Sequence, residues 1–220
     1  MLNLPSTCAI DLPVALGPFD MRDDVHQSDW RAALPVLAAE GVTLRALRAS
    51  DAPTLHAMLT TEEVARFISP PPTTVEGFEK FIAWTHRRQA EGRYVCFGIV
   101  PAGRSDAVGI IQLRALDGNF ELAEWGFAIG SPFWGTGMFQ ASARAVLAFA
   151  FTMLPVSRIE ARVVTENRRG LGALTKLGAT CDAVMRQSFR RGTARMDQTL
   201  WSIVRDTWMV ANATCGGRVH

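Results

Sequence analysis

Apolar and polar residues begin to alternate regularly at Val42, and this alternation predicts the first strand of a sheet. The strand runs from Val42 to Leu47 and ends before Ser50-Asp51, a pair typical of a helix start. Other short apolar runs are bounded by Gly, Pro, Asn and Asp, as strands usually are. They predict strands at 93–100, 107–115, 120–129, 158–164, 183–189 and 194–204, with hairpin turns at 117–119 and 190–193.

Apolar residues at helical spacing predict the helices between these strands. One helix is expected over 52–66 and a second over 74–92, separated by the prolines of 69–72, which forbid a helix interior. Two more are expected over 137–153 and 168–177. This order predicts a mixed α/β (α+β) fold: a mostly antiparallel sheet of about seven strands, with one parallel crossover, flanked by helices.

The two ends of the chain lack this regularity. The first forty residues are rich in Pro, Asp and Leu, and their only helical candidate, 29–40, is interrupted by Pro35. We therefore interpret 1–40 as an N-terminal extension, 41–208 as the folded domain and 209–220 as a C-terminal tail. Whether the extension caps a binding groove or forms dimer contacts stays open, as does the choice between monomer and homodimer.

Composition indicates one ordinary globular domain without an electrostatic function. The 220 residues are 48% hydrophobic and 20% charged, with a formal net charge of only +2. This charge is too small to indicate a nucleic-acid-binding surface, so no nucleic-acid partner is expected. Arginines do gather late in the chain, but such runs are usually solvated faces. They are Arg168, Arg169, Arg186, Arg190, Arg191 and Arg195.

Neither metal binding nor membrane insertion is expected. The four cysteines have no C-x-x-C spacing, so neither zinc nor a disulfide framework is implied. The N-terminus lacks the basic segment of a signal peptide. The apolar run 145–151 is far shorter than the ~20 residues that span a bilayer. A cytoplasmic location is the simplest interpretation.

A glycine-containing turn precedes the long apolar helix predicted over 137–153. In Phe133-Trp134-Gly135-Thr136-Gly137-Met138, two glycines flank one residue where bare backbone N–H groups can converge on an anion. A phosphate fits such a turn. The spacing alone is equally that of an ordinary strand-to-helix connection, and neither a P-loop nor a dinucleotide fingerprint is present.

Several runs around this turn resemble the GNAT superfamily of acyl-CoA-dependent N-acyltransferases, most closely its ribosomal-protein N-terminal (RimJ/RimL-type) branch. The resemblance extends from Val42 to Trp208 in the family's order. It implies a GNAT-type single domain that uses acetyl-CoA as cosubstrate, without a metal. The runs are AEWGFAI at 123–129, FWGTG at 133–137, RIEARV at 158–163, Asn167, and KLGA at 176–179.

The resemblance also implies where acetyl-CoA binds. The backbone amides of Trp134, Gly135, Thr136, Gly137 and Met138 would hold the pyrophosphate. The pantetheine arm would lie along the strand Phe127-Ala128-Ile129, whose edge offers main-chain hydrogen bonds. Asn167 matches a family asparagine that contacts the cofactor, although an Asn at this point is equally a helix cap.

Glu124 is the candidate catalytic residue. A protonated amine must lose a proton before it attacks a thioester, and the pattern A-E-x-x-F resembles the strand from which some family members present a general base. The alternative is a salt-bridged surface glutamate. His56 and His86 are further candidate bases. Trp84, Trp125 and Phe133 either line an acceptor pocket or belong to the core.

Leu174 stands where many relatives have a tyrosine that protonates the leaving thiolate. Pro132 and Gly170 also replace side chains that contact phosphate in relatives, so only the backbone contacts to the phosphate are expected to remain.

The function that the resemblance implies is acetyl transfer from acetyl-CoA to a primary amine. No cysteine is placed to carry the acyl group, so direct attack in a ternary complex is expected. The acceptor, a small molecule or a peptide, stays open. The alternative is a non-catalytic acyl-CoA-binding regulatory module.

Overall fold

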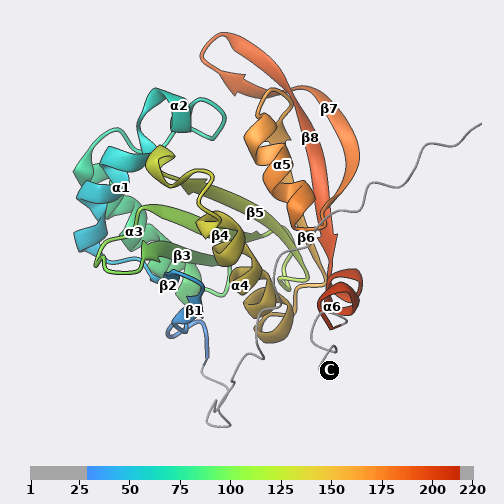
Figure 1. The fold of residues 1–220 in the computed structure, drawn as a ribbon, viewed down its shortest axis with the longest axis horizontal. Coiled ribbons are helices and arrows are strands. Elements are labelled where there is room, and N and C mark those ends of the chain that lie inside the picture. Colours follow the sequence, from blue (N-terminus) through green and yellow to red (C-terminus); the bar gives the residue numbers. More distant parts are fainter. Residues whose placement is uncertain (1–28, 214–220) are drawn as a thin grey trace, which may run out of the picture.

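The computed structural model describes residues 29–213, which form a single twisted sheet with helices packed against it (Figure 1). The sheet has eight strands in the order β1-β2-β3-β4-β5-β6-β8-β7. The strands are β1 (Leu37–Ala39), β2 (Val42–Ala46), β3 (Tyr94–Pro101), β4 (Gly109–Ala115), β5 (Leu122–Ile129), β6 (Arg158–Val164), β7 (Thr180–Arg191) and β8 (Ala194–Val204). The helices are α1 (Ala52–Leu59), α2 (Glu62–Ala65), α3 (Val75–Ala90), α4 (Met138–Met153), α5 (Arg168–Lys176) and α6 (Arg205–Ala213).

The predicted mixed fold is confirmed, including its one parallel crossover. β5 and β6 pair in parallel around α4, and all other neighbours pair antiparallel. The parallel pairing joins only Leu122–Glu124 to Arg158–Glu160, after which the two strands separate. The sheet therefore opens between its two halves at the carboxyl ends of β5 and β6.

Two layers of side chains cover the two faces of the sheet. Successive residues of β3 belong to different layers, which explains why the whole strand is buried. Val95, Phe97 and Ile99 pack with α4, whereas Tyr94 and Cys96 pack with α1 and α3. The α4 face holds the main core, and the α1/α3 face is the side on which Glu124 lies.

The helical candidate at 29–40 does not form a helix. This segment forms a turn followed by β1, which pairs antiparallel with β2. Trp30 is buried and stacks on Phe120, with ring centroids 5.7 Å apart, and its carbonyl accepts a hydrogen bond from Gln89. The sheet therefore has one strand more than predicted and begins at Leu37. The rest of the expected extension, 1–28, lies outside the described residues.

Two further boundaries differ from the sequence-based expectation. The helix expected over 52–66 is interrupted between α1 and α2, where the Thr60 hydroxyl donates a hydrogen bond to the His56 carbonyl. Residues 205–213 form α6 rather than an irregular tail, because Trp208 packs against Phe151 of α4 with ring centroids 5.5 Å apart. Residues 214–220 lie outside the described range.

Candidate active site

A row of polar side chains crosses three strands on the α1/α3 face of the sheet. Tyr94 on β3 lies opposite Arg114 on β4, and Arg114 lies opposite Glu124 on β5. Side chains directly opposite each other on neighbouring strands lie close enough to interact. The register of the sheet therefore assembles this row from residues that are distant in sequence.

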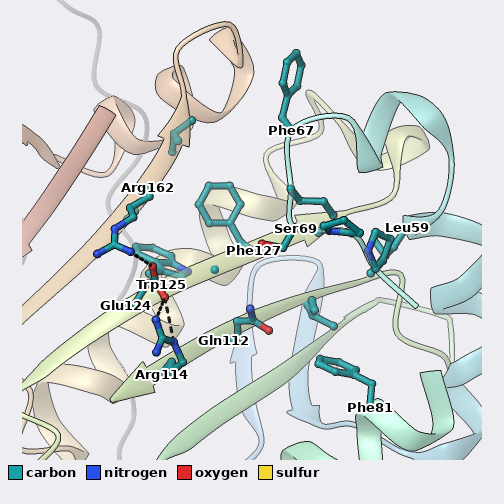
Figure 2. A pocket seen from close by; sticks show the side chains of 18 of the residues that line it. Leu59, Phe67, Ser69, Phe81, Gln112, Arg114, Glu124, Trp125, Phe127 and Arg162 are labelled. Carbon is teal, nitrogen blue, oxygen red and sulfur yellow. Dashed lines mark hydrogen bonds and ion pairs between the residues drawn. The ribbon is translucent and has the colours of Figure 1, made fainter. Parts of the chain in front are cut away.

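Glu124 lies between two guanidinium groups (Figure 2). Its Oε2 accepts hydrogen bonds from Nε and Nη2 of Arg114, at 3.1 and 2.5 Å. Its Oε1 lies 3.5 Å from Nη1 of Arg162 on β6, which is too long for a strong hydrogen bond. The Glu124 side chain is 23% exposed, so Oε1 keeps capacity to accept a proton or bind a water.

The position of the Gln112 side chain depends on the absence of a side chain at Gly126. Gly126 lies opposite Gln112, and a Cβ at Gly126 would lie 2.6 Å from the Gln112 Nε2. Because that space is free, Gln112 lies over the strand, and its Oε1 accepts a hydrogen bond from the hydroxyl of Tyr94. Burial raises the pKa of Tyr94, so this hydroxyl keeps its proton.

Backbone amides of β5 face the gap between β5 and β6. Leu116 N donates to Leu122 O at 2.8 Å, and Gly130 N donates to Val108 O at 3.0 Å. Hydrogen-bonded pairs alternate along an antiparallel ladder, so Phe127 and Ile129 point their N–H groups away from β4. The β5–β6 pairing ends at Glu124, which leaves this edge open for an extended ligand.

The predicted anion-binding turn lies at the start of α4. Gly135 and Gly137 have φ angles of 78° and 82°, in the region that favours glycine, and a Cβ at either would meet nothing within 4 Å. Gly137 is the N-cap and provides no side-chain cap. Among the described residues, nothing accepts from the amides of 135–137, so these donors are free to bind an anion. Thr136 and Met138 interact within the turn, because the Thr136 hydroxyl donates to Phe133 O at 2.8 Å and lies 3.4 Å from Met138 N.

Asn167 is the N-cap of α5, as the helix-cap interpretation requires. Its Oδ1 accepts a hydrogen bond of 2.9 Å from Gly170 N. Asn167 also lines the cavity beside β5, and its Nδ2 has no partner among residues 29–213. Capping uses only the oxygen, so the amide nitrogen remains available to a ligand.

A cavity of about 620 Å³ lies beside Glu124 and Asn167, and Figure 2 shows part of its lining, which does not include the turn at 135–137. Glu124, Phe127 and Ala128 of β5 are among the residues that line it. On the other sides, aromatic residues and the triple-proline loop form an apolar wall. That wall includes Phe67, Phe78, Phe81, Trp84, Phe189 and Pro70–Pro72.

The β7–β8 hairpin reaches across toward α2 (Figure 1). Arg191 Nη1 donates a hydrogen bond to the carbonyl of Ala65, at the end of α2. The β7–β8 register shifts between Met185 and Phe189, where Gln187 adopts a positive φ of 50° and donates its N–H to Asp197. Phe189 follows this bulge and lines the cavity, so the hairpin forms part of the cavity wall.

Several candidates from the sequence lie outside the cavity lining. His56 and His86 each place Nε2 against a backbone carbonyl, Thr73 O at 3.0 Å and Leu47 O at 2.9 Å. Leu174 is fully buried in the core, so its position offers no acid to the cavity. Trp84 lines the cavity and Phe133 packs against the core, whereas Trp125 is a buried core residue that also lines the cavity.

The sequence did not reveal Tyr94, Gln112, Arg114 and Arg162 as site residues. They lie on three strands: Tyr94 on β3, Gln112 and Arg114 on β4, and Arg162 on β6. The alternation of Gln112 and Arg114 about Leu113 was a signal that β4 has a polar face, but only the register shows that this face meets Glu124.

Comparison with known proteins now gives the family. The profile of the acetyltransferase (GNAT) domain matches residues 42–180, which include β2 to β6 and the turn at 135–137. The chain belongs to the GNAT acetyltransferase family. It is thus an acetyl-CoA-dependent N-acetyltransferase, as the resemblance implied.

Relatives of this GNAT chain cover most of its length. It is 28% identical over 174 residues to an uncharacterized N-acetyltransferase, YoaA, of Bacillus subtilis, covering 78% of this chain and 97% of that protein. The putative ribosomal N-acetyltransferase YdaF of the same organism is 23% identical over 77% of this chain and 94% of its own. The fold matches Mycobacterium smegmatis RimJ in complex with CoA-disulfide, with a TM-score of 0.69, 20% identity, and coverage of 81% and 93%.

Between residues 29 and 213, no helix is long and apolar enough to cross a membrane. The same residues hold no group of three or more His, Cys, Asp or Glu side chains that could bind a metal ion.

Proposed function

We propose that this GNAT chain transfers the acetyl group directly from acetyl-CoA to a primary amine while both are bound, with Glu124 as the general base. The observation that supports this proposal is the position of Glu124. Its carboxylate lies in the cavity on the strand whose free amides, at Phe127 and Ile129, face the open gap.

The residues of the gap fit acetyl-CoA. The free amides at 135–137 suit its pyrophosphate, and the open edge of Phe127–Ile129 suits the amide groups of its pantetheine arm. Nδ2 of Asn167 offers one further donor. When bound, acetyl-CoA supplies the thioester that is to be cleaved.

The chemistry requires one proton to leave the amine. Glu124 accepts it, directly or through a water, and the nitrogen then forms a bond to the carbonyl carbon as the C–S bond breaks. A backbone N–H of Phe127 or Ile129 stabilises the negative charge that develops on the carbonyl oxygen. The thiol has an ordinary pKa of about 8.5, so its thiolate leaves without a dedicated acid.

Direct attack agrees with the positions of the described cysteines. Cys96 is buried, which raises the pKa of its thiol, and Cys181 is exposed on β7. Neither lines the cavity. Neither is therefore placed to carry an acetyl group between the two substrates.

The test is the substitution Glu124→Gln, which keeps the shape of the side chain and removes its basicity. We expect kcat for amine acetylation to fall by about 10²–10⁴-fold, the usual contribution of a general base, with the affinity for acetyl-CoA unchanged. Release of free thiol measures the rate, and calorimetric titration measures the affinity. Glu121→Gln, an exposed glutamate at the start of the same segment, is the control.

An unchanged rate in Glu124→Gln across the pH range contradicts the proposed base. If the native protein binds acetyl-CoA but releases no thiol with any amine, it is the non-catalytic binding module instead. The acceptor is proposed only as a small-molecule or peptide amine. Solved proteins of this fold include one named a ribosomal-protein-S5-alanine acetyltransferase and one named a spermidine N-acetyltransferase.

A further inference from the structure

A second, smaller cavity adjoins the first. Its volume is about 140 Å³, and it is lined by Trp84, Arg88, Arg93, Tyr94, Arg114 and Ala115. Trp84, Tyr94 and Arg114 also line the larger cavity, so the two spaces share a wall. Every charged residue of the smaller lining is an arginine, which makes it a site for an anion.

The arginines of this site keep donors available. Arg114 binds Glu124 through Nε and Nη2 and leaves Nη1 without a partner among the described residues. Arg93 makes one long contact, 3.5 Å to the carbonyl of Asp117. Arg88 pairs with Glu91, but both side chains are about half exposed, at 44% and 51%, and such surface pairs are weak and easily exchanged.

Aromatic side chains form part of the wall that this site shares with the larger cavity. Trp84 stacks on Phe81 and meets the ring of Tyr94 edge-on, with centroids 6.2 and 4.8 Å apart. Trp84 is nevertheless 37% exposed, as expected for an aromatic side chain that is available to a ligand.

The charged residues of the larger cavity also favour a ligand that carries a negative group. Its lining holds Arg114 and Arg162 but only one acid, Glu124, which already lies between them. A polyamine would bring several positive charges to a site with an excess of positive charge, and like charges repel. A negative group at some distance from the amine is therefore favoured over a second amine.

We propose that the acceptor is a primary amine that carries an anionic group, a carboxylate or a phosphate, beyond an apolar spacer. The anion binds Arg88, Arg93 and Arg114, the spacer lies against Trp84, and the amine reaches Glu124. This inference rests on the proposed function, because it assumes that the amine is acetylated beside Glu124.

Matched peptides test the charge alone. The tripeptide amides Ala-Phe-Glu-NH₂ and Ala-Phe-Gln-NH₂ have the same shape and differ by one negative charge. We expect kcat/KM to be about tenfold higher for the Glu peptide, the scale of one charge-assisted hydrogen bond, and the ratio to fall in high salt. Ala-Phe-phosphoserine-NH₂ shows whether phosphate is preferred to carboxylate, and spermidine represents the polyamines.

Arg93→Gln is the variant for the anion site, because Arg93 lies in the smaller cavity and not in the larger one. We expect it to bring the Glu/Gln ratio close to one. Arg87→Gln, an exposed arginine of α3 that lines neither cavity, removes the same charge and is expected to leave the ratio unchanged.

Equal kcat/KM for the two peptides in the native protein, a ratio that survives Arg93→Gln, or a preference for spermidine overturns the proposal. A binding measurement distinguishes failure of the anion-site proposal from failure of the proposed acetyl transfer. Calorimetric titration of both peptides in the presence of CoA reports the charge preference without turnover. Equal affinities refute the anion site even if no peptide is acetylated, whereas a Glu preference without acetylation refutes only the proposed chemistry.

Discussion

At the scale of single residues, the site depends on what each side chain meets across the sheet. Glu124 is fixed by Arg114 from the neighbouring strand and faces Arg162 from the strand beyond the gap. Gly126, two residues further along the same face of β5, gives Gln112 the room to accept the hydrogen bond of Tyr94. A glycine here thus serves the packing of two polar side chains rather than a turn.

Gly126→Ala tests this packing. The new methyl group would collide with Gln112 and leave the buried Tyr94 hydroxyl without its acceptor, a loss of about 1–3 kcal/mol in the free energy of unfolding. Chemical denaturation measures it. Gly118→Ala is the control, because a Cβ at Gly118 meets nothing within 4 Å. Equal stability of both variants would show that Gln112 has another acceptable position.

At the scale of elements, the start of α4 and the separation of β5 from β6 together create the predicted cofactor site. The parallel pair is short, and the helix between its strands begins at a turn with free amides. The sequence predicted both the turn and the crossover. The open edge at Phe127–Ile129 followed only from the family resemblance, and the structure adds the position at which β5 and β6 part, directly after Glu124.

Gly135→Asp tests the turn. A carboxylate beside the free amides would repel the pyrophosphate, so we expect the affinity for acetyl-CoA to fall below detection in a calorimetric titration. Gly103→Asp is a matched control, because both glycines have a φ of 78° and nothing within 4 Å of a Cβ. Both variants carry the same backbone strain of about 1–2 kcal/mol, and only Gly135→Asp is expected to change binding. Tight binding by Gly135→Asp would place the pyrophosphate elsewhere.

At the scale of the whole molecule, one buried ion pair joins distant segments of the α1/α3 face. Asp51 accepts two hydrogen bonds of 2.8 Å from Arg45 of β2, and one each from the amides of Arg48 and Ala107. Burial by itself raises the pKa of Asp51, but the hydrogen bonds from Arg45 and the two amides outweigh it and leave the pKa lowered.

This lowered pKa predicts the direction of a pH effect on stability. The contribution of Asp51 is present above the unfolded-state pKa of about 3.9 and is lost as the pH falls through the lower folded-state value. Asp51→Asn is expected to cost about 3 kcal/mol at neutral pH, since it leaves Arg45 buried and unpaired, and to flatten the acid limb of the stability curve. Urea unfolding from pH 7 to pH 2 measures the loss of stability at neutral pH and the shape of the acid limb. The exposed Asp29→Asn should change neither, and an unaltered acid limb in Asp51→Asn would contradict the assignment.

The sequence by itself determined the elements and their order. Periodicity located every strand from β2 to β8 and the helices α3, α4 and α5, because the spacing of apolar residues is set locally by each element. It also located Glu124 and the glycine turn, since both lie in short continuous runs. It missed β1 and α6, which are stabilised by Trp30 on Phe120 and Trp208 on Phe151.

The tertiary structure decided what surrounds the predicted residues. Arg114 and Arg162 reach Glu124, and Tyr94, Trp84 and Arg93 meet beside them, through the register of the sheet and the packing of α3. These contacts join residues far apart in the chain, and no local pattern encodes them, because a shift of one residue in register turns each side chain to the opposite face. The charge of the proposed acceptor site, and with it the kind of amine that we propose it favours, therefore depends on the folded sheet.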